Sequence, residues 1–251
     1  VESGKALEYM AMAGWKTKQM IGGLPGIMNL AAASGEDLGS VSDIVTDALT
    51  AFRMNAEDAG RFADVLAQAS SNANTNVGMM GATFQKVAPV AGALGYSVED
   101  MSLAIGLMAN ASIKADVAGT SLKTSLANMA KPTKQMKAYM DRYGISLTRS
   151  DGTMKTFREV VDNLRGSLGG LSEAEQVAAA TAIFGKESFA GMLAVVNASD
   201  EDYKKLSDSI NNAKGAAERM AAIKLDNLEG DITLMKSALD GLQIAIGDAL
   251  L

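Results

Sequence analysis

Short polar side chains followed three residues later by an acidic residue recur along this chain. An Asn, Ser or Thr side chain in front of a helix accepts a hydrogen bond from a free backbone N–H group, and an acid at the third helical position can reach back to the cap. Five such pairs are present, at Asn55–Asp58, Ser97–Asp100, Thr156–Glu159, Ser172–Glu175 and Ser199–Asp202. Ser34, just before Glu36 and Asp37, indicates a further start. The chain is therefore expected to fold into many short helices.

Apolar residues between these starts recur at helical spacing, as Leu38, Val41, Val45 and Leu49 do. Short connections predict that neighbouring helices pack antiparallel. The expected fold class is all-α, a multi-helix bundle of short antiparallel helices. Helices are predicted at 5–20, 37–53, 56–73, 76–94, 98–112, 116–130, 133–143, 157–167, 173–196 (broken at Gly185) and 200–213.

One segment has the pattern of a small β-hairpin. Residues 145–149 alternate between apolar and polar side chains, Asp151-Gly152 is a turn pair, and residues 153–157 can return. We therefore predict a hairpin over 144–157. It divides an N-terminal helical part, 1–143, from a second helical part, 158–213.

The stretch from Gln19 to Gly35 contains no charged residue. A membrane-spanning helix needs about 20 apolar residues without helix breakers. This stretch is shorter and contains Gly22, Gly23, Pro25 and Gly26. We predict two short buried helices here.

The last segment, 214–251, has a heptad pattern. Apolar residues alternate at spacings of three and four, as on the contact face of a coiled coil. We call these positions the seam: Leu225, Leu228, Ile232, Met235, Leu239, Leu242, Ile246 and Ala249. We predict a long coiled-coil-like helix that leads into the rest of a longer chain. It either self-associates through the seam or packs on the core of its own domain.

The composition restricts the chemistry that this chain can perform. Cys and His are both absent, which removes thiol nucleophiles and nearly every transition-metal site. No P-loop or dinucleotide fingerprint occurs. The remaining catalytic option is a pair of carboxylates, such as Glu36 with Asp43 or Glu99 with Asp100. Capping and solvation also explain these acids, and we expect no enzymatic activity, cofactor or metal.

The net charge of −6 is unevenly distributed. Between Lys114 and Arg165 there are ten basic and five acidic residues, a local charge of +5. We call five of these residues the basic patch: Lys131, Lys134, Lys137, Arg142 and Arg149. The patch either faces DNA or is a solvated helix face.

A weak internal repeat is visible at an offset of 42 positions (97 minus 55). Asn55-Ala-Glu-Asp58 recurs as Ser97-Val-Glu-Asp100, and Ala69-Ser70 aligns with Ala111-Ser112. Helical repeats of about 40 residues build solenoids. Two copies that share mostly small residues leave open whether a true duplication is present.

Blocks of small and apolar residues follow one another in an order that no catalytic site requires. They include residues 6–15, 24–26, 30–38, 59–62, 75–77, 87–95, 105–111, 130–134, 144–146, 171–175, 183–185, 226–230 and 244–247. This series resembles the core region of phage tail tape-measure proteins of the TP901 type.

The resemblance implies a structural virion protein located in the lumen of the tail tube. Such proteins act in tail assembly, set the tail length and leave with the DNA at infection. The implied partners are sister copies in a trimer or hexamer, tail tube and baseplate proteins, and tail assembly chaperones. Phage DNA and the host membrane are further candidate partners, and the resemblance adds the tail tube to DNA as a surface that the basic patch could face. No catalytic residue belongs to this region of the family.

Two questions stay open at this point. A straight helix rises about 1.5 Å per residue, so a block that folds back on itself measures far less per residue than a rod. We therefore hypothesise that this block assembles or anchors the tail and that helices outside it measure length. The alternative functions are a membrane-active module that aids DNA entry and a carboxylate hydrolase acting on peptidoglycan.

Overall fold

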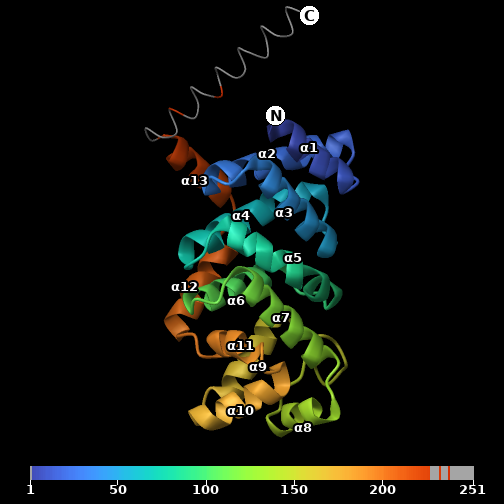
Figure 1. The fold of residues 1–251 in the computed structure, drawn as a ribbon, viewed down its shortest axis with the longest axis vertical. Coiled ribbons are helices and arrows are strands. Elements are labelled where there is room, and N and C mark those ends of the chain that lie inside the picture. Colours follow the sequence, from blue (N-terminus) through green and yellow to red (C-terminus); the bar gives the residue numbers. More distant parts are fainter. Residues whose placement is uncertain (1, 227–231, 233–236, 238–251) are drawn as a thin grey trace, which may run out of the picture.

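The computed structural model describes residues 2–226 together with 232 and 237 (Figure 1). Its elements are α1 (Glu2–Met12), α2 (Thr17–Ser34), α3 (Leu38–Ala51), η1 (Ala56–Asp58), α4 (Ala59–Asn72), α5 (Val77–Ala93), α6 (Val98–Asn110), α7 (Ala115–Ala130), α8 (Lys134–Arg142), α9 (Phe157–Leu168), α10 (Glu173–Phe184), α11 (Phe189–Val196), α12 (Asp200–Asn211) and α13 (Ala216–Leu225). The prediction of an all-α fold is confirmed.

The first seven helices stack in two layers rather than around one bundle axis. Among these seven, each helix packs most extensively on a helix two places away along the chain, so that α1, α3, α5 and α7 form one layer and α2, α4 and α6 the other. Figure 1 shows the elongated stack that results. The helices form layers because their apolar surfaces are wide, so that one helix can pack on neighbours at several sides. In α6 the buried residues, eleven of 13, face all sides and contact both layers.

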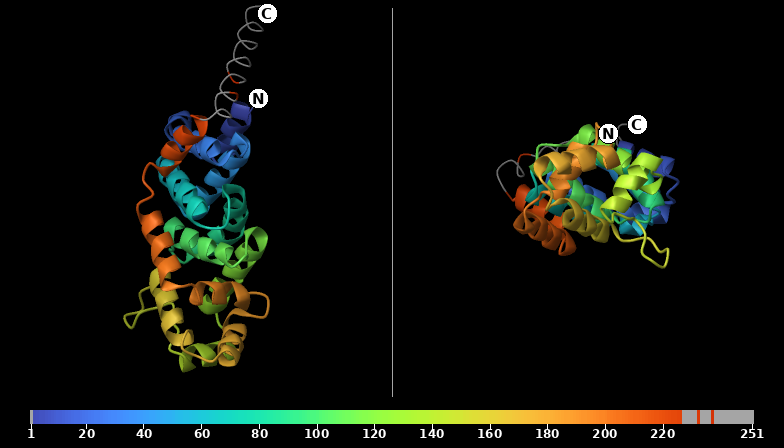
Figure 2. Two further views of the ribbon diagram at one scale, coloured as in Figure 1. Left: turned by 90° about the vertical axis from the view of Figure 1, so that its left-hand side faces the viewer. Right: turned by 90° about the horizontal axis from the view of Figure 1, so that it is seen from below.

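The chain turns at the far end of the stack and then runs back along it. Helices α8, α9, α10 and α11 form that end, with α10 and α11 packed on α7. Then α12 packs on α6 and α4, and α13 on α4 and α2. Both views show this return beside the stack (Figures 1 and 2). We call α12 and α13 the return segment. It brings residue 226 to the same end as α1 and α2.

Four helix–helix turns repeat one backbone geometry. A residue with positive φ is followed by an apolar residue whose N–H bonds five positions back, and the next residue caps a helix. These trios are Gly14-Trp15-Lys16, Arg53-Met54-Asn55, Gly95-Tyr96-Ser97 and Ser112-Ile113-Lys114. The bonds run from Trp15 N to Met10 O, from Met54 N to Leu49 O, from Tyr96 N to Ala91 O and from Ile113 N to Met108 O, at 3.0, 2.8, 3.0 and 2.9 Å. The turn thus recurs at the offset of 42 seen in the sequence, and also at offsets of 39 (54 minus 15) and 17 (113 minus 96).

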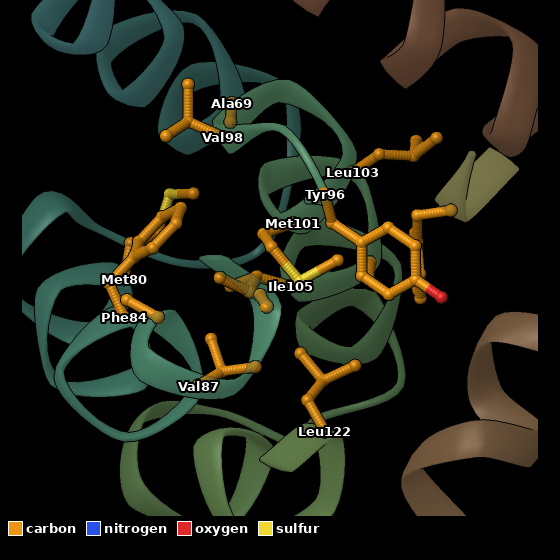
Figure 3. Close-up of a cluster of buried hydrophobic side chains, with 14 of the residues drawn as sticks. Ala69, Met80, Phe84, Val87, Tyr96, Val98, Met101, Leu103, Ile105 and Leu122 are labelled. Atoms are coloured by element: carbon orange, nitrogen blue, oxygen red, sulfur yellow. The ribbon is translucent and has the colours of Figure 1, made fainter. Parts of the chain in front are cut away.

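One continuous core runs from Met10 to Ala217 and crosses residues 143 and 157. The division of the chain at those positions stays a prediction. At the middle of the stack, Phe84 meets Phe62 edge to face with ring centroids 5.3 Å apart. Around it lie aliphatic and methionine side chains, including Met80, Met101 and Leu122 (Figure 3).

Near the N-terminus the helix boundaries differ from the prediction. Residues 5–20 are not one helix, because α1 ends at Met12 and Gly14 takes a φ of 80°. Residues 19–35 are not two short helices, because α2 continues through Pro25 to Ser34. Proline leaves the carbonyl four residues earlier without its partner, here that of Ile21. Ile21 and Pro25 both lie on the exposed side of α2, where water can satisfy that carbonyl. The start near Ser34 is capped by Asp37, whose Oδ1 accepts from Ser40 N at 2.9 Å.

The predicted hairpin over 144–157 is wrong as a pair of strands. This segment holds only an isolated antiparallel bridge between Thr148 and Met154. The turn itself is present, and Gly152 has a φ of 84°. Side chains take the backbone groups that a longer ladder would need. Ser146 Oγ accepts from Thr148 N at 3.1 Å, while Asn163 Oδ1 accepts from Ser146 N at 3.3 Å.

Only the beginning of the predicted long helix over 214–251 can be compared with the structure. Gly215 has a φ of 73°, and α13 starts at Ala216 and ends at Leu225. Of the seam, Leu225 is half-buried and Ile232 is exposed. Leu228, Met235, Leu239, Leu242, Ile246 and Ala249 lie outside the described residues. The long coiled-coil-like helix stays a prediction.

Candidate functional site

The basic patch lies at the end of the stack formed by α8 and its neighbours (Figure 1). All five of its side chains are exposed. Within residues 2–226, two of them are paired with carboxylates. Lys137 Nζ lies 2.9 Å from Asp141 Oδ1, and Arg149 Nη2 lies 2.5 Å from Glu159 Oε2.

The other three members of the patch are Lys131, Lys134 and Arg142. Lys131 follows the end of α7, and the Arg142 guanidinium stacks over the Tyr143 ring at 5.5 Å. No carboxylate oxygen of the described residues lies within 4 Å of these three side chains. The patch thus presents a locally positive surface, and whether a partner uses it stays a prediction.

A second surface lies at the opposite end, which we call the α1–α2 end. It is formed by α1, α2 and the last turn of α13. Large apolar side chains are exposed there, and Met12, Ile223 and Ile21 are the most exposed, at 75%, 71% and 69%. The prediction from sequence missed this surface. The available signal is the uncharged stretch from Gln19 to Gly35, for which the sequence predicts two short buried helices.

Charged side chains inside the molecule serve to fix the return segment. Asp64 on α4 accepts from the first N–H groups of α13, with Oδ2 2.6 Å from Gly215 N and Oδ1 3.0 Å from Ala217 N. A carboxylate at a helix N-terminus is favoured by both the free N–H groups and the helix dipole. Asp64 therefore attaches α13 to the stack.

Two arginines on α9 extend this attachment. Arg158 bonds to Asp100 Oδ1 on α6 at 3.1 Å, and to Ser207 and Asn211 on α12. Arg165 donates to the carbonyls of Val195 and Val196 at the end of α11 and, at 2.7 Å, to that of Ala198 just beyond it. Its guanidinium lies over the Tyr203 ring at 5.2 Å. These contacts hold α9, α11 and α12 together.

Two of the acids considered for catalysis, Glu99 and Asp100, have structural partners. Glu99 is bound by Arg61 through two bonds of 2.8 and 2.9 Å, whereas its neighbour Asp100 is bound by Arg158. The two carboxylates are thus held by different arginines. Asp43 lies next to Asp47 on α3, and burial together with that neighbouring charge raises the pKa of Asp43.

Across the described part of the chain, no group of three or more metal-ligating side chains comes together. A cleft of about 400 Å³ lies between α4, α6 and the return segment, lined by residues that include Arg61, Asp64 and Lys214. Arg61, Asp64 and Glu99 in this lining already make the contacts given above. Among the described helices, none is both long and apolar enough to cross a membrane.

Comparison with known proteins gives the family. A family model described as phage-related minor tail protein matches residues 1–185. A tape measure protein of Pneumococcus phage Dp-1 is 35% identical over 249 residues, which cover 99% of this chain and 22% of that protein. A probable tape measure protein of Escherichia phage P2 is 24% identical over 232 residues, which cover 91% of this chain and 28% of that protein.

The chain thus spans only 22–28% of the length of these relatives. No solved structure matches it. The resemblance to tape-measure proteins that the sequence indicated is confirmed by the family model and by both relatives. The chain therefore belongs to the phage-related minor tail protein family.

Proposed function

We propose that residues 1–251 form an assembly domain of a tape-measure polypeptide, located in the lumen of the phage tail tube. The domain anchors or nucleates the tail, and the rest of the longer polypeptide spans its length. The coarse role, a structural component of a phage tail, follows from the family. The finer role rests on the way this block is folded.

The observation that carries the proposal is that the chain folds back on itself instead of extending. Residues 2–226, 225 residues in total (226 minus 2 plus 1), would extend roughly 340 Å as one straight helix. They instead form thirteen α-helices that stack and return to their starting end. Such a block adds little length per residue, so it is poorly suited to measuring and well suited to making contacts.

Self-association is the second part of the proposal. The seam provides eight apolar positions at heptad spacing, starting at Leu225. We propose that sister copies, in a trimer or hexamer, join through it and that the seam helix continues into the measuring rod. The basic patch at the other end is the proposed contact with the tube, the baseplate or DNA.

Two deletions of equal size in the full tape-measure gene separate anchoring from measuring. Removing residues 55–96 should reduce the number of tails, without a matching change in the length of the tails that remain. Removing the same number of residues from the helical remainder should shorten every tail by about 60 Å. Electron microscopy of tails from both variants measures count and length. Proportional shortening by the first deletion would refute the assembly role.

A further inference from the structure

The α1–α2 end differs from the rest of the surface in its exposed apolar side chains. Ten large apolar side chains are exposed among the described residues, and six of them belong to α1, α2, α13 or residue 232: Leu7, Met12, Ile21, Met28, Ile223 and Ile232. Stacks of helical repeats normally end in a polar face. Apolar side chains gathered on one surface mark a contact site.

The outward side of α2 forms the middle of this surface. Ile21, Gly22, Pro25 and Met28 are all exposed and follow each other at helical spacing. Lys18 is the only charged residue of this 18-residue helix. A Cβ added at Gly22 would meet nothing within 4 Å, so another helix can approach the backbone closely there.

The inward side of α2 is already occupied. A Cβ on Gly23 would lie 2.5 Å from the Trp15 ring, and one on Gly26 would lie 2.6 Å from the Cα of Gly60. The glycines on the inner side of α2 therefore allow close packing on η1 and the rest of the stack, while apolar side chains on its outer side are exposed to solvent. Packing within the chain explains the inner side only.

The position of this surface indicates which partner covers it. The chain leaves α13 at the same end, and the 25 residues that follow (251 minus 226) include most of the seam (Figure 1). In a parallel coiled coil, equivalent residues of the copies lie side by side. Copies joined through the seam would bring their α1–α2 ends to the same level. The part of α2 that follows Lys18 carries no charge, so two copies of it can meet there without repulsion between like charges.

We propose that Ile21, Pro25 and Met28 pack against the same helix of a second copy of this chain. The α1–α2 end is then an interface between copies in addition to the seam. This inference rests on the proposed self-association and adds to it a contact made by the folded stack itself.

Cysteine cross-linking tests the contact, because the natural chain contains no Cys. Ile21→Cys and Met28→Cys place one thiol on the proposed interface. Val177→Cys, 42% exposed on α10 at the other end, is the matched control. Neighbouring thiols in a complex react at effective concentrations in the millimolar range. With a short bismaleimide and micromolar protein, covalent dimer should therefore form at least about tenfold faster from the two interface variants than from the control.

A second variant tests the energetic contribution. Ile21→Lys combined with Met28→Lys changes only exposed side chains, and circular dichroism checks that the helices remain. The mass of the complex from light scattering should fall, or the concentration needed for association should rise about tenfold, because charges now meet in the interface.

The outcomes separate this inference from the proposed function. A chain that associates through the seam, yet cross-links no faster at Ile21→Cys than at Val177→Cys, would overturn the contact and leave the self-association standing. A chain that is a single copy at every concentration would overturn both. Cross-linking of Ile21→Cys only to another segment of the full tape-measure polypeptide would assign the surface to that segment and refute a second copy as its partner.

Discussion

At the scale of residues, the four repeated turns share a backbone conformation but not a residue type. The positive-φ position is Gly14 in the first turn, Arg53 in the second, Gly95 in the third and Ser112 in the fourth. An L-residue with a side chain pays roughly 1–2 kcal/mol in the left-handed region, which glycine avoids. Arg53 is exposed and makes no hydrogen bond or ion pair to a described side chain. It therefore holds strain that nothing nearby offsets.

Replacing Arg53 by glycine should raise the free energy of unfolding by about 0.5–1 kcal/mol, the relief of strain less the added entropy of the unfolded chain. Gly95→Ala at the equivalent position should lower it by a similar amount. A Cβ on Gly95 meets nothing within 4 Å, so only backbone strain acts there. Urea denaturation followed by circular dichroism measures both. Changes of the same sign would show that the turns are not equivalent.

Glu159 provides a prediction about pH. Its bonds with Arg149 and with the Thr156 N–H lower the pKa of Glu159 to about 2. A carboxyl whose pKa is lower in the folded state contributes stability above its ordinary pKa of about 4.3 and loses it as pH falls toward the folded value. Glu159→Gln should therefore lower the melting temperature most at pH 7. The difference should shrink below about pH 4.5 and vanish near pH 2.

Calorimetric melting curves of both proteins between pH 2 and 7 check this expectation. The same substitution in an Arg149→Ala background is the control. That background already lacks the ion pair with Glu159, while a glutamine at position 159 can still accept the hydrogen bond of the helix cap. A difference that persists unchanged at pH 2 would assign the effect to the cap rather than to the ion pair.

At the scale of elements, local chemistry made most helix starts predictable from the sequence. Thr156 and Ser172 form capping boxes with Glu159 and Glu175, as their spacing indicated. What failed depended on tertiary context. Pro25 suggested a break, but the helix continues because the proline lies on the outer side of α2.

The layers and the candidate surfaces were less accessible to sequence reasoning. The arrangement of the helices in two layers depends on which helices pack their apolar faces against each other. A sequence pattern made mostly of small residues does not say which pairs these are. The exposed stripe on α2 has the same residue types as a buried one, so sequence alone assigned both sides to the core. The basic patch, defined by charge, could be identified directly, although two of its members are paired.

The attachment of α13 gives a prediction for one element. Asp64→Ala removes two hydrogen bonds at a helix N-terminus and should cost about 1–2 kcal/mol. Amide hydrogen exchange of residues 216–225 should speed up before that of α5 or α7, because α13 opens on its own. Asp37→Ala removes an ordinary cap from α3 and should leave exchange in α13 unchanged. Equal acceleration throughout the chain would show that α13 unfolds only with the whole stack.

At the scale of the whole molecule, the return segment decides how the stack responds to a change in length. A free solenoid is held by contacts between neighbours and can lose an internal repeat. Here α12 spans α4 and α6, while α13 spans α2 and α4. The return segment can therefore make all of these contacts only with a stack that has its present length. Its polar anchors, Asp64 and Arg158, stand on α4 and α9, far apart in the sequence.

Deleting residues 55–96 tests whether this matching governs stability. The deletion joins Met54 to Ser97 at equivalent turn positions, so the local turn is preserved. It also removes α4 and α5. With α4 go Asp64 and a packing surface that both return helices share, and with α5 goes the helix on which α7 packs. Loss of several buried contacts at once should lower the melting temperature by well over the roughly 4 °C that a change of about 1 kcal/mol produces. Calorimetry of the isolated chain would measure this. A deletion variant that melts within a few degrees of the intact chain would mean that the stack behaves as a free solenoid and that the return segment only lies along it.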